Sequence, residues 1–403
     1  MGESGDLTES VLIALRREPA VLEAVRELAG DELRAQQRLR KEFPAELVRA
    51  ACLLHELRQR AHAKFTRADR MWFDRLGLEQ ATSEPVARHK ARRFGLSSEP
   101  VWDLCCGVGG DTIGLAVETE VVAVDRSPLR CRMTQWNAEA YEVADRVHVL
   151  QGDAVVLLPP GVFVHLDPDR RAEAGSAGRS LLGEPRRRAV SLDQYHPGPT
   201  FWRELMRQTR GGAIKIGPAA NFFGRFRNAE IELISLNREC KEATVWFGEL
   251  SGPMPMRATV LPAGASLAGD PDQAECRVGQ PGDFLYDPDP ALVRSGLVDV
   301  LAEQLDLRRL DASEEYLTAD RPIDSPFLRR FVLREIVPNN DRAIRQAFRR
   351  FACHEIEIKS RHIPINADAI RRRLPRDGGA RGVLIFARVA GKTRALICER
   401  DDG

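Results

Sequence analysis

Apolar positions recur with helical spacing through the first quarter of the chain. Between residue 8 and about residue 95 they fall at intervals of three, four or seven, as in Leu47, Leu54, Leu57 and Ala61. This period is typical of amphipathic helices, and Pro19 is a residue that commonly begins a new helix. We therefore predict an N-terminal helical domain over residues 1–95.

From about residue 96 to residue 250 the pattern changes to short apolar runs that alternate with helical stretches. The runs lie at residues 101–104, 121–125, 147–153, 162–168 and 211–218. Such alternation predicts a mostly parallel sheet in an α/β fold, and two further runs, 230–236 and 242–248, predict an antiparallel edge. Glycine, proline and aspartate are frequent over 251–283, although 257–261 is compatible with one more strand. We place a domain boundary near residue 270, so the α/β domain spans 96–270.

A glycine-rich turn follows the first of these runs. Gly107, Gly109 and Gly110 leave bare backbone and amide N–H groups at the start of a helix, which suits a nucleotide-like cofactor. A dinucleotide fingerprint would need glycine at position 112, where Thr112 stands. Asp103, just before the turn, would repel a pyrophosphate but attract the amino group and sulfonium of S-adenosylmethionine.

Acidic residues stand at the ends of the following runs as well. Asp125 closes the second run, Asp153 the third and Asp167 the fourth. Ligands of open α/β sheets bind at the carboxyl ends of the strands. We therefore expect Asp125 to hold ribose hydroxyls and Asp153 to accept a hydrogen bond from the adenine amino group.

The segment from Asp103 to Ile113, followed by Asn137 to Tyr141, resembles the class I S-adenosylmethionine-dependent methyltransferases. Within that class it is most similar to the trimethylguanosine-synthase-like RNA guanine-N2 methyltransferases. The resemblance implies a Rossmann-like sheet and methyl transfer to the exocyclic amine of an RNA base. The cofactor-binding residues that it implies are Asp103, Cys105, Gly107, Gly109, Asp125, Arg126, Asp153 and Ala154.

The end of the fourth run departs from the pattern of these enzymes, which carry Asp, Asn or Ser, then Pro-Pro and an aromatic residue. Here the sequence is Asp167-Pro168-Asp169-Arg170, and we predict these four as the catalytic residues. By analogy Asp167 accepts a hydrogen bond from the target amine, and Arg170 holds substrate by stacking or by binding phosphate. The departure leaves two alternatives open: a small-molecule or protein acceptor, or a non-catalytic protein that binds S-adenosylmethionine or RNA.

The C-terminal part resembles a THUMP-like domain, which we place at residues 283–403. The resemblance rests on four segments, namely Leu285–Pro290, Tyr316–Thr318, Pro326–Phe327 and Glu355–Arg361. The net charge of the whole chain is only +1, but residues 321–403 hold 19 lysines and arginines against 10 acids. A basic module predicts contact with RNA phosphates. The alternative is a set of solvated arginine faces, because arginine is frequent throughout the chain.

Two further segments each allow two interpretations. Glu79, Gln80 and Thr82 precede the first strand, and either close over the cofactor or pack against the sheet. The long segment 172–199, with Arg179 and Arg186–Arg188, is either a substrate loop or a solvated insertion.

The remaining composition predicts a cytoplasmic protein. No apolar run reaches the length of a membrane span, and the N-terminal residues do not form a secretory signal. Eight scattered cysteines without a C-x-x-C pair indicate a reducing compartment, and we expect neither a metal site nor a membrane partner.

Overall fold

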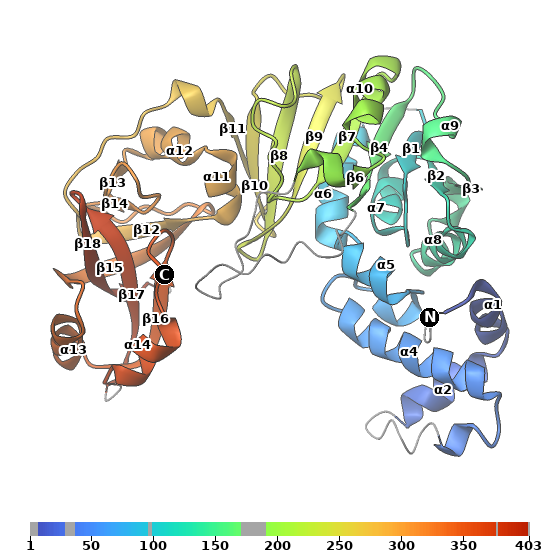
Figure 1. Ribbon diagram of the computed structural model, residues 1–403, viewed down its shortest axis with the longest axis horizontal. Coiled ribbons are helices and arrows are strands. Elements are labelled where there is room, and N and C mark those ends of the chain that lie inside the picture. The colour runs from blue at the N-terminus through green and yellow to red at the C-terminus, as the bar shows by residue number, and fades with distance from the viewer. Residues whose placement is uncertain (1–6, 29–36, 96–98, 171–190, 376–377, 402–403) are drawn as a thin grey trace. The chain divides into compact units, whose positions relative to one another are not determined.

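The computed structural model describes residues 7–28, 37–95, 99–170, 191–375 and 378–401 (Figure 1). The chain divides into two compact units. The first unit comprises residues 1–229 and 243–252, and the second comprises 230–242 and 253–403. The division into three domains drawn from the sequence stays a prediction.

The first unit begins with helices and continues as an α/β sheet. Its helices are α1 (Glu9–Arg17), α2 (Pro19–Glu27), α4 (Ala45–Ala61), α5 (Arg75–Gln80), α6 (Glu84–Phe94), α7 (Gly110–Glu118), α8 (Pro128–Ala140), α9 (Ala154–Leu157) and α10 (Pro199–Gln208). Its strands are β1 (Val101–Leu104), β2 (Val121–Asp125), β3 (Val147–Gln151), β4 (Phe163–Leu166), β5 (Asp169–Arg170), β6 (Tyr195–His196), β7 (Gly211–Ile216) and most of β9 (Glu239–Gly248). Short 3-10 turns lie at Ala68–Arg70, Ala144–Arg146 and Leu192–Gln194.

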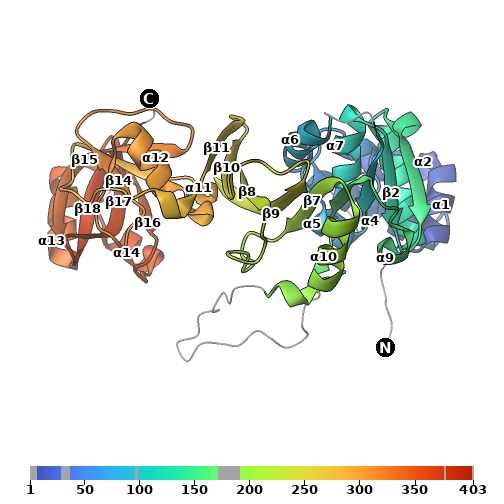
Figure 2. The ribbon, with the colours of Figure 1, turned by 90° about the horizontal axis from the view of Figure 1, so that it is seen from above.

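The main sheet of this unit has the order β9-β7-β4-β1-β2-β3. Strands β7, β4, β1, β2 and β3 are parallel, while β9 runs antiparallel to β7. The predicted α/β fold is thereby confirmed. In Figure 2 helices α6 and α7 lie on one side of the strands and α10 on the other.

The N-terminal helices share one apolar core with the helices of the sheet. Leu12, Leu54 and Phe73 belong to the same buried cluster as Ile113 of α7 and Trp136 of α8. Helical periodicity predicted the elements correctly, and the shared core explains why α1, α2 and α4 fold in this unit.

The second unit combines three strands and a separate seven-stranded sheet. The three strands, in the order β8-β10-β11, are β8 (Ala229–Leu236), β10 (Met256–Leu261) and β11 (Ala265–Gly269). β11 lies within residues 251–283 but outside 257–261, the stretch that the sequence analysis found compatible with one more strand. The seven-stranded sheet has the order β13-β14-β12-β15-β18-β17-β16. Its strands are β12 (Phe284–Pro288), β13 (Arg308–Arg309), β14 (Leu317–Ala319), β15 (Leu328–Pro338), β16 (Cys353–Ser360), β17 (Ala380–Val389) and β18 (Lys392–Arg400).

Both faces of the seven-stranded sheet are buried. The helices of this unit are α11 (Pro290–Ser295), α12 (Val298–Leu305), α13 (Asp341–Arg350) and α14 (Ala367–Arg373), with a 3-10 turn at Pro271–Gln273. Ile344 and Phe348 of α13 join Phe386 and Ile397 in the core on one face. A second cluster that contains Phe331 covers the other face. None of the described helices is both long and apolar enough to cross a membrane.

Candidate active site

Four carboxylates meet at the carboxyl edge of the sheet of the first unit. β1 lies between β2 and β4, so Asp103, Asp125 and Asp167 come from neighbouring strands. Together with Asp169, their charges act on the thiol of Cys105, a residue with a positive φ of 62°. Burial, and then the charges of Asp125, Asp167, Asp169 and Asp103, raise the pKa of the Cys105 thiol far above its usual value. The thiol therefore stays protonated and is no nucleophile.

The glycine turn leaves room for a ligand. Gly107 has a φ of 60°, and a Cβ on it would meet no atom within 4 Å. Beside it, Asp125 accepts hydrogen bonds from the amides of Gly107 (3.0 Å) and Ser127 (2.8 Å) and remains partly exposed. Open space over bare backbone, next to a carboxylate at the end of β2, fits a nucleoside with ribose hydroxyls.

Asp103 lies beneath this turn and has no exposed surface. One of its oxygens accepts from Thr112 and the other lies 2.8 Å from Nδ1 of His165. His165 is fully buried and continues to Lys90, whose Nζ lies 3.3 Å from its Nε2. Asp103 therefore links α7, the helix that follows the glycine turn, to His165 of β4. Its predicted contact with the cofactor stays a prediction.

Lys90 forms an ion pair with Asp111, the second residue of α7, at 2.9 Å. Burial opposes ionisation of Asp111, but the charges of Lys90 and His165 outweigh it and hold the pKa of Asp111 well below its usual range. Thr82 donates to the other oxygen of Asp111 (2.6 Å). A buried charged network thus fixes the helix that carries the glycine turn.

The segment before the first strand packs closely on α7. A Cβ on Gly110 would lie 2.9 Å from the carbonyl oxygen of Thr82. Lys64 donates to the carbonyls of Leu78, Glu79 and Ala81, each at 2.8 Å, which fixes the end of α5. Thr82 is buried by this packing, while Glu79 and Gln80 are exposed.

Asp167 pairs with a lysine from the neighbouring strand. Its Oδ2 lies 2.7 Å from Nζ of Lys215 on β7, and the pair is partly exposed. Burial raises the pKa of Asp167 above its usual value, although Lys215 acts in the opposite direction. Lys215 also donates to the carbonyl of Gln80 (3.4 Å), so the segment before β1 lies beside Asp167.

The two residues after Pro168 form a short strand of their own. Pro168 is buried, whereas Asp169 and Arg170 are exposed and pair antiparallel with His196 and Tyr195. The Tyr195 hydroxyl accepts from the amide of Gly217 at 2.8 Å, just beyond β7. This pairing holds Arg170 at the edge of the site. The predicted substrate-loop residues Arg179 and Arg186–Arg188 lie outside the described residues.

Asp153 lies at the start of α9, where it accepts from the amide of Val155 (2.9 Å) and from Arg126 (2.5 Å). Arg126 also contacts Nε2 of His196 at 3.0 Å. Arg126 thus connects the ends of β2 and β3 with β6, and Ala154 is buried next to Asp153. These contacts place the predicted adenine-side residues together.

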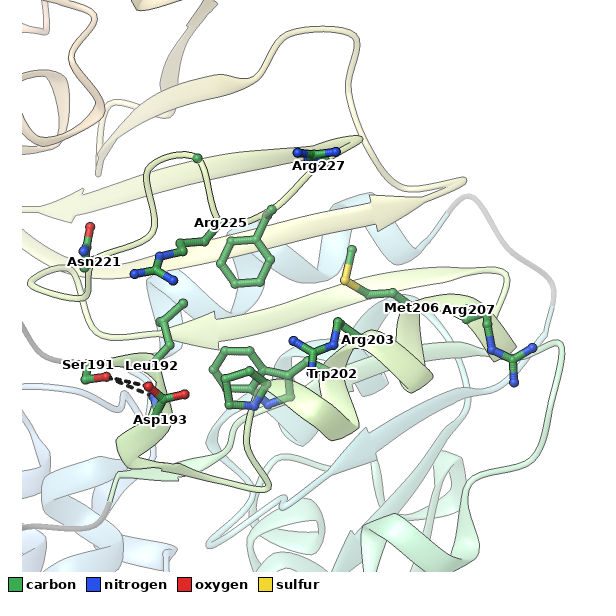
Figure 3. Close-up of a pocket in the computed structure, with 13 residues that line it drawn as sticks. Ser191, Leu192, Asp193, Trp202, Arg203, Met206, Arg207, Asn221, Arg225 and Arg227 are labelled. Atoms are coloured by element: carbon green, nitrogen blue, oxygen red, sulfur yellow. Dashed lines mark hydrogen bonds between the residues drawn. The ribbon is translucent and has the colours of Figure 1, made fainter.

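A cavity of about 710 Å³ lies between α10 and the loop 218–228 (Figure 3). Figure 3 shows Arg203 on α10, and Arg225 and Arg227 on the loop above it. In the described part of the chain no carboxylate forms an ion pair with any of these three arginines. Leu192 and Asp193, directly before β6, line the same cavity, as do the aromatic rings of Trp202 and Phe226, whose centroids are 6.2 Å apart.

In the second unit, three of the four segments of the THUMP-like resemblance meet around Asp287. Its carboxylate pairs with Arg361 (2.6 Å) and Lys359 (3.0 Å), and Arg361 lies over the ring of Tyr316. Burial opposes ionisation of Asp287, but the charges of Arg361 and Lys359 outweigh it and lower its pKa. Arg238 donates to the carbonyl of Asp287 at 3.0 Å.

Sequence reasoning missed the partners of the predicted acids. Lys215 and His165 interrupt the apolar runs of β7 and β4, and Lys90 lies on the buried face of α6. A single polar residue inside an apolar run is the signal that could have identified them, because a buried polar group requires a partner.

The chain is similar to several known proteins. Over 325 residues the chain is 33% identical to uncharacterised S-adenosylmethionine-dependent methyltransferases from two strains of Mycobacterium tuberculosis, which covers 77% of this chain and 83% of each relative. The chain belongs to the S-adenosylmethionine-dependent methyltransferases. S-adenosylmethionine is accordingly the cofactor of this methyltransferase, and the resemblance drawn from its sequence is confirmed.

Family models match three stretches of this methyltransferase. Residues 98–169 match a model described as RNA cap guanine-N2 methyltransferase, and residues 328–400 match one described as THUMP domain-like. Residues 19–61 match a domain of unknown function. A putative methyltransferase from Porphyromonas gingivalis W83 has the same fold, with a TM-score of 0.76, 20% identity and coverage of 96% of this chain and 99% of that one.

Proposed function

We propose that this methyltransferase transfers a methyl group from S-adenosylmethionine to the exocyclic amine of a base in RNA. The observation that carries the proposal is the cavity of α10, where Arg203, Arg225 and Arg227 lack acidic partners among the described residues. Unpaired guanidinium groups beside aromatic rings suit a phosphate backbone with an unstacked base. The family model over 98–169 supports the same substrate class.

The residues around the glycine turn would hold the cofactor. The open space over Gly107 lets it approach the backbone, and Gly109, with a φ of 84°, shapes the turn. Asp125 takes the ribose hydroxyls, and Arg126 with Asp153 lies at the adenine end. When bound, S-adenosylmethionine supplies an electrophilic methyl group. Asp103 contributes through its buried contacts with Thr112 and His165, which fix the helix after the turn.

Asp167 orients the acceptor amine and takes up the proton that the amine loses. It is partly exposed beside Lys215, and burial raises its pKa toward the range in which a carboxylate can accept a proton. Pro168 fixes the backbone after it. Asp169 and Arg170 are exposed at the edge of the site, where Arg170 can bind a phosphate of the substrate.

The second unit contributes a further RNA surface in this proposal. Arg342 and Arg349 of α13 and Arg372 of α14 are exposed and have no acidic partner in the described residues. We also place the protein in the cytoplasm, since none of its eight cysteines forms a disulfide, as expected in a reducing compartment.

One feature favours a second candidate. Asp169 and Arg170 replace the proline and aromatic residue of base-amine methyltransferases, and both side chains are exposed rather than stacked over a site. A methyltransferase with a small-molecule or protein acceptor would need no such aromatic residue.

The experiment that separates these functions is methyl transfer from radiolabelled S-adenosylmethionine into total RNA from a strain that lacks this protein. A protein extract and a small-molecule fraction serve as parallel acceptor pools. We expect label in RNA, and none with the variant Asp167→Ala. Label only in another pool would replace RNA with that acceptor class, and absence of cofactor binding by calorimetry would favour a non-catalytic role.

A further inference from the structure

A compact group of potential metal ligands lies in the second unit and shares no residue with the methyltransferase site described above. It consists of Glu314 and Glu315, just before β14, and His362, just after β16. One ligand atom from each residue lies within 4.8 Å of the other two. Glu315 and His362 are 47 positions apart in sequence, which explains why spacing predicted no metal site.

The buried member of the group has an unsatisfied oxygen. Glu314 is only 1% exposed, and one of its carboxylate oxygens accepts from the amide of Arg388 at 2.7 Å. The other oxygen, Oε2, has no hydrogen-bond partner. A buried carboxylate oxygen without a partner is costly, and a bound cation would satisfy it.

The surrounding charges also point to a cation. Several acids of this unit pair with an arginine or lysine, as Asp287, Asp320 and Glu399 do. Among the described residues, no lysine or arginine forms an ion pair with Glu314 or Glu315. Two carboxylates without a cationic partner are thus held beside an imidazole.

We propose that Glu314, Glu315 and His362 bind a divalent transition-metal ion of the zinc class. Nε2 of His362 lies 2.5 Å from Oε2 of Glu315, and metal binding replaces this hydrogen bond. Zinc–ligand bonds of about 2.0–2.2 Å place ligand atoms roughly 3.4 Å apart. The atoms of His362 and Glu315 therefore need to separate by about 1 Å, and the wider pairs, at most 4.8 Å apart, need to close by roughly 1.4 Å or less. An imidazole ligand favours zinc, cobalt or nickel over magnesium and calcium.

The ligand set leaves at least one coordination position for water, because zinc commonly takes four ligands. His362 and Glu315 are reachable from solvent, whereas Glu314 is buried, so the ion enters from the exposed side of His362. The proposal is independent of the acceptor of the methyltransferase, since it uses no residue of the first unit.

The test uses the full chain without an affinity tag, stripped of metal by a chelator. Zn²⁺ is titrated calorimetrically, and Co²⁺ is titrated with visible absorption as the readout. We expect one equivalent of each ion per chain and a thermal unfolding temperature that rises with Zn²⁺. The variants Glu314→Gln and His362→Ala should each weaken binding at least about tenfold.

His354→Ala is the matched control, because His354 is an exposed histidine of the same unit and should leave binding unchanged. Glu314→Gln keeps an acceptor for the amide of Arg388, and circular dichroism checks its folding; the exposed His362 provides a second variant should Glu314→Gln fail to fold. Absence of Zn²⁺ binding, affinity unchanged in His362→Ala, or a cobalt–thiolate charge-transfer band would overturn the proposal. The last result would assign the metal to cysteines.

Discussion

The arginines of the two units differ in what surrounds them. On the seven-stranded sheet, Arg308 pairs with Asp320 at 2.9 Å and Arg330 with Asp324 at 2.6 Å. Around the α10 cavity, Arg203, Arg225 and Arg227 have no acidic partner within the described residues. The two arginines on the sheet are therefore neutralised by neighbouring carboxylates, while the three arginines around the cavity have no such carboxylate in the described part of the chain.

For anion binding, the charges that immediately surround a basic residue therefore matter more than the net charge of the segment to which it belongs. Ion pairs on a surface lower the local potential, and a phosphate must compete with the carboxylate already present. The excess of basic residues over 321–403 predicted an RNA surface there, but several of these residues, such as Arg334 and Arg350, already pair with acids of the same unit. Four tests address the comparison.

The largest effect is expected for Asp167→Ala, which tests whether the chemistry belongs to the first unit, the one that contains the α10 cavity. Loss of the carboxylate removes the acceptor of the amine proton, so methyl transfer should fall by about 10²–10⁴-fold. RNA binding should change little. Asp69→Ala, an exposed acid of the same unit, is the control for rate measurements with labelled cofactor. An unchanged rate in Asp167→Ala would remove this residue from the mechanism.

The second test addresses the ion pairs of the second unit. Asp287→Asn leaves Arg361 and Lys359 without their carboxylate and should lower the free energy of unfolding by about 3 kcal/mol, measured by urea denaturation at neutral pH. Asp324→Asn, at a largely exposed pair, should cost less than about 1 kcal/mol.

The pH dependence of Asp287 has a definite sign. Its pKa is lower in the folded than in the unfolded chain, so its stabilisation is fully present above the unfolded value of about 3.9 and is lost as the pH falls through the folded value. The stability gap between wild type and Asp287→Asn should therefore narrow below about pH 4. A gap that widens in acid would contradict the assigned ion pairs.

The third test sharpens the comparison directly. Arg225→Ala combined with Arg227→Ala should weaken RNA binding about tenfold and reduce the slope of log affinity against log salt by roughly 1.5–2. The matched control pairs Arg334→Ala with Arg350→Ala, since both of these arginines already have carboxylate partners. Fluorescence anisotropy with labelled RNA over a salt series provides both quantities.

The smallest effect is expected for Arg342→Ala combined with Arg372→Ala. These arginines are unpaired but are not grouped around a cavity, so we expect a loss of RNA affinity of only about threefold. The same anisotropy assay measures it. A loss larger than that of the cavity variant would reverse the comparison and place the main RNA surface on the second unit.

The fold of the first unit could be predicted because its signals are local. Apolar runs, glycines and terminal acids determine β1, α7 and β2 without reference to distant residues. Which partner each acid takes could not be predicted, because Lys215 is separated from Asp167 by 48 positions and His165 from Asp103 by 62. Such pairs exist only once the sheet brings its strands together.

The cavity and the metal ligands escaped prediction for a related reason. Arg203 and Arg225 are ordinary members of an arginine-rich sequence, and only the absence of acidic neighbours distinguishes them. Glu314 was equally inconspicuous, since its burial depends on packing against the end of β17. Charge balance is a property of the folded neighbourhood and has no counterpart in residue counts.

The glycines of the turn have a consequence for how this enzyme can be altered. A saturation screen would score Gly107 and Gly110 alike, as positions that reject every side chain. The causes are opposite: the space over Gly107 is open for a bound molecule, whereas at Gly110 even a methyl group would meet the Thr82 carbonyl at 2.9 Å. An engineer can therefore redesign the surroundings of Gly107, while Gly110 belongs to the scaffold and has to be left as it is.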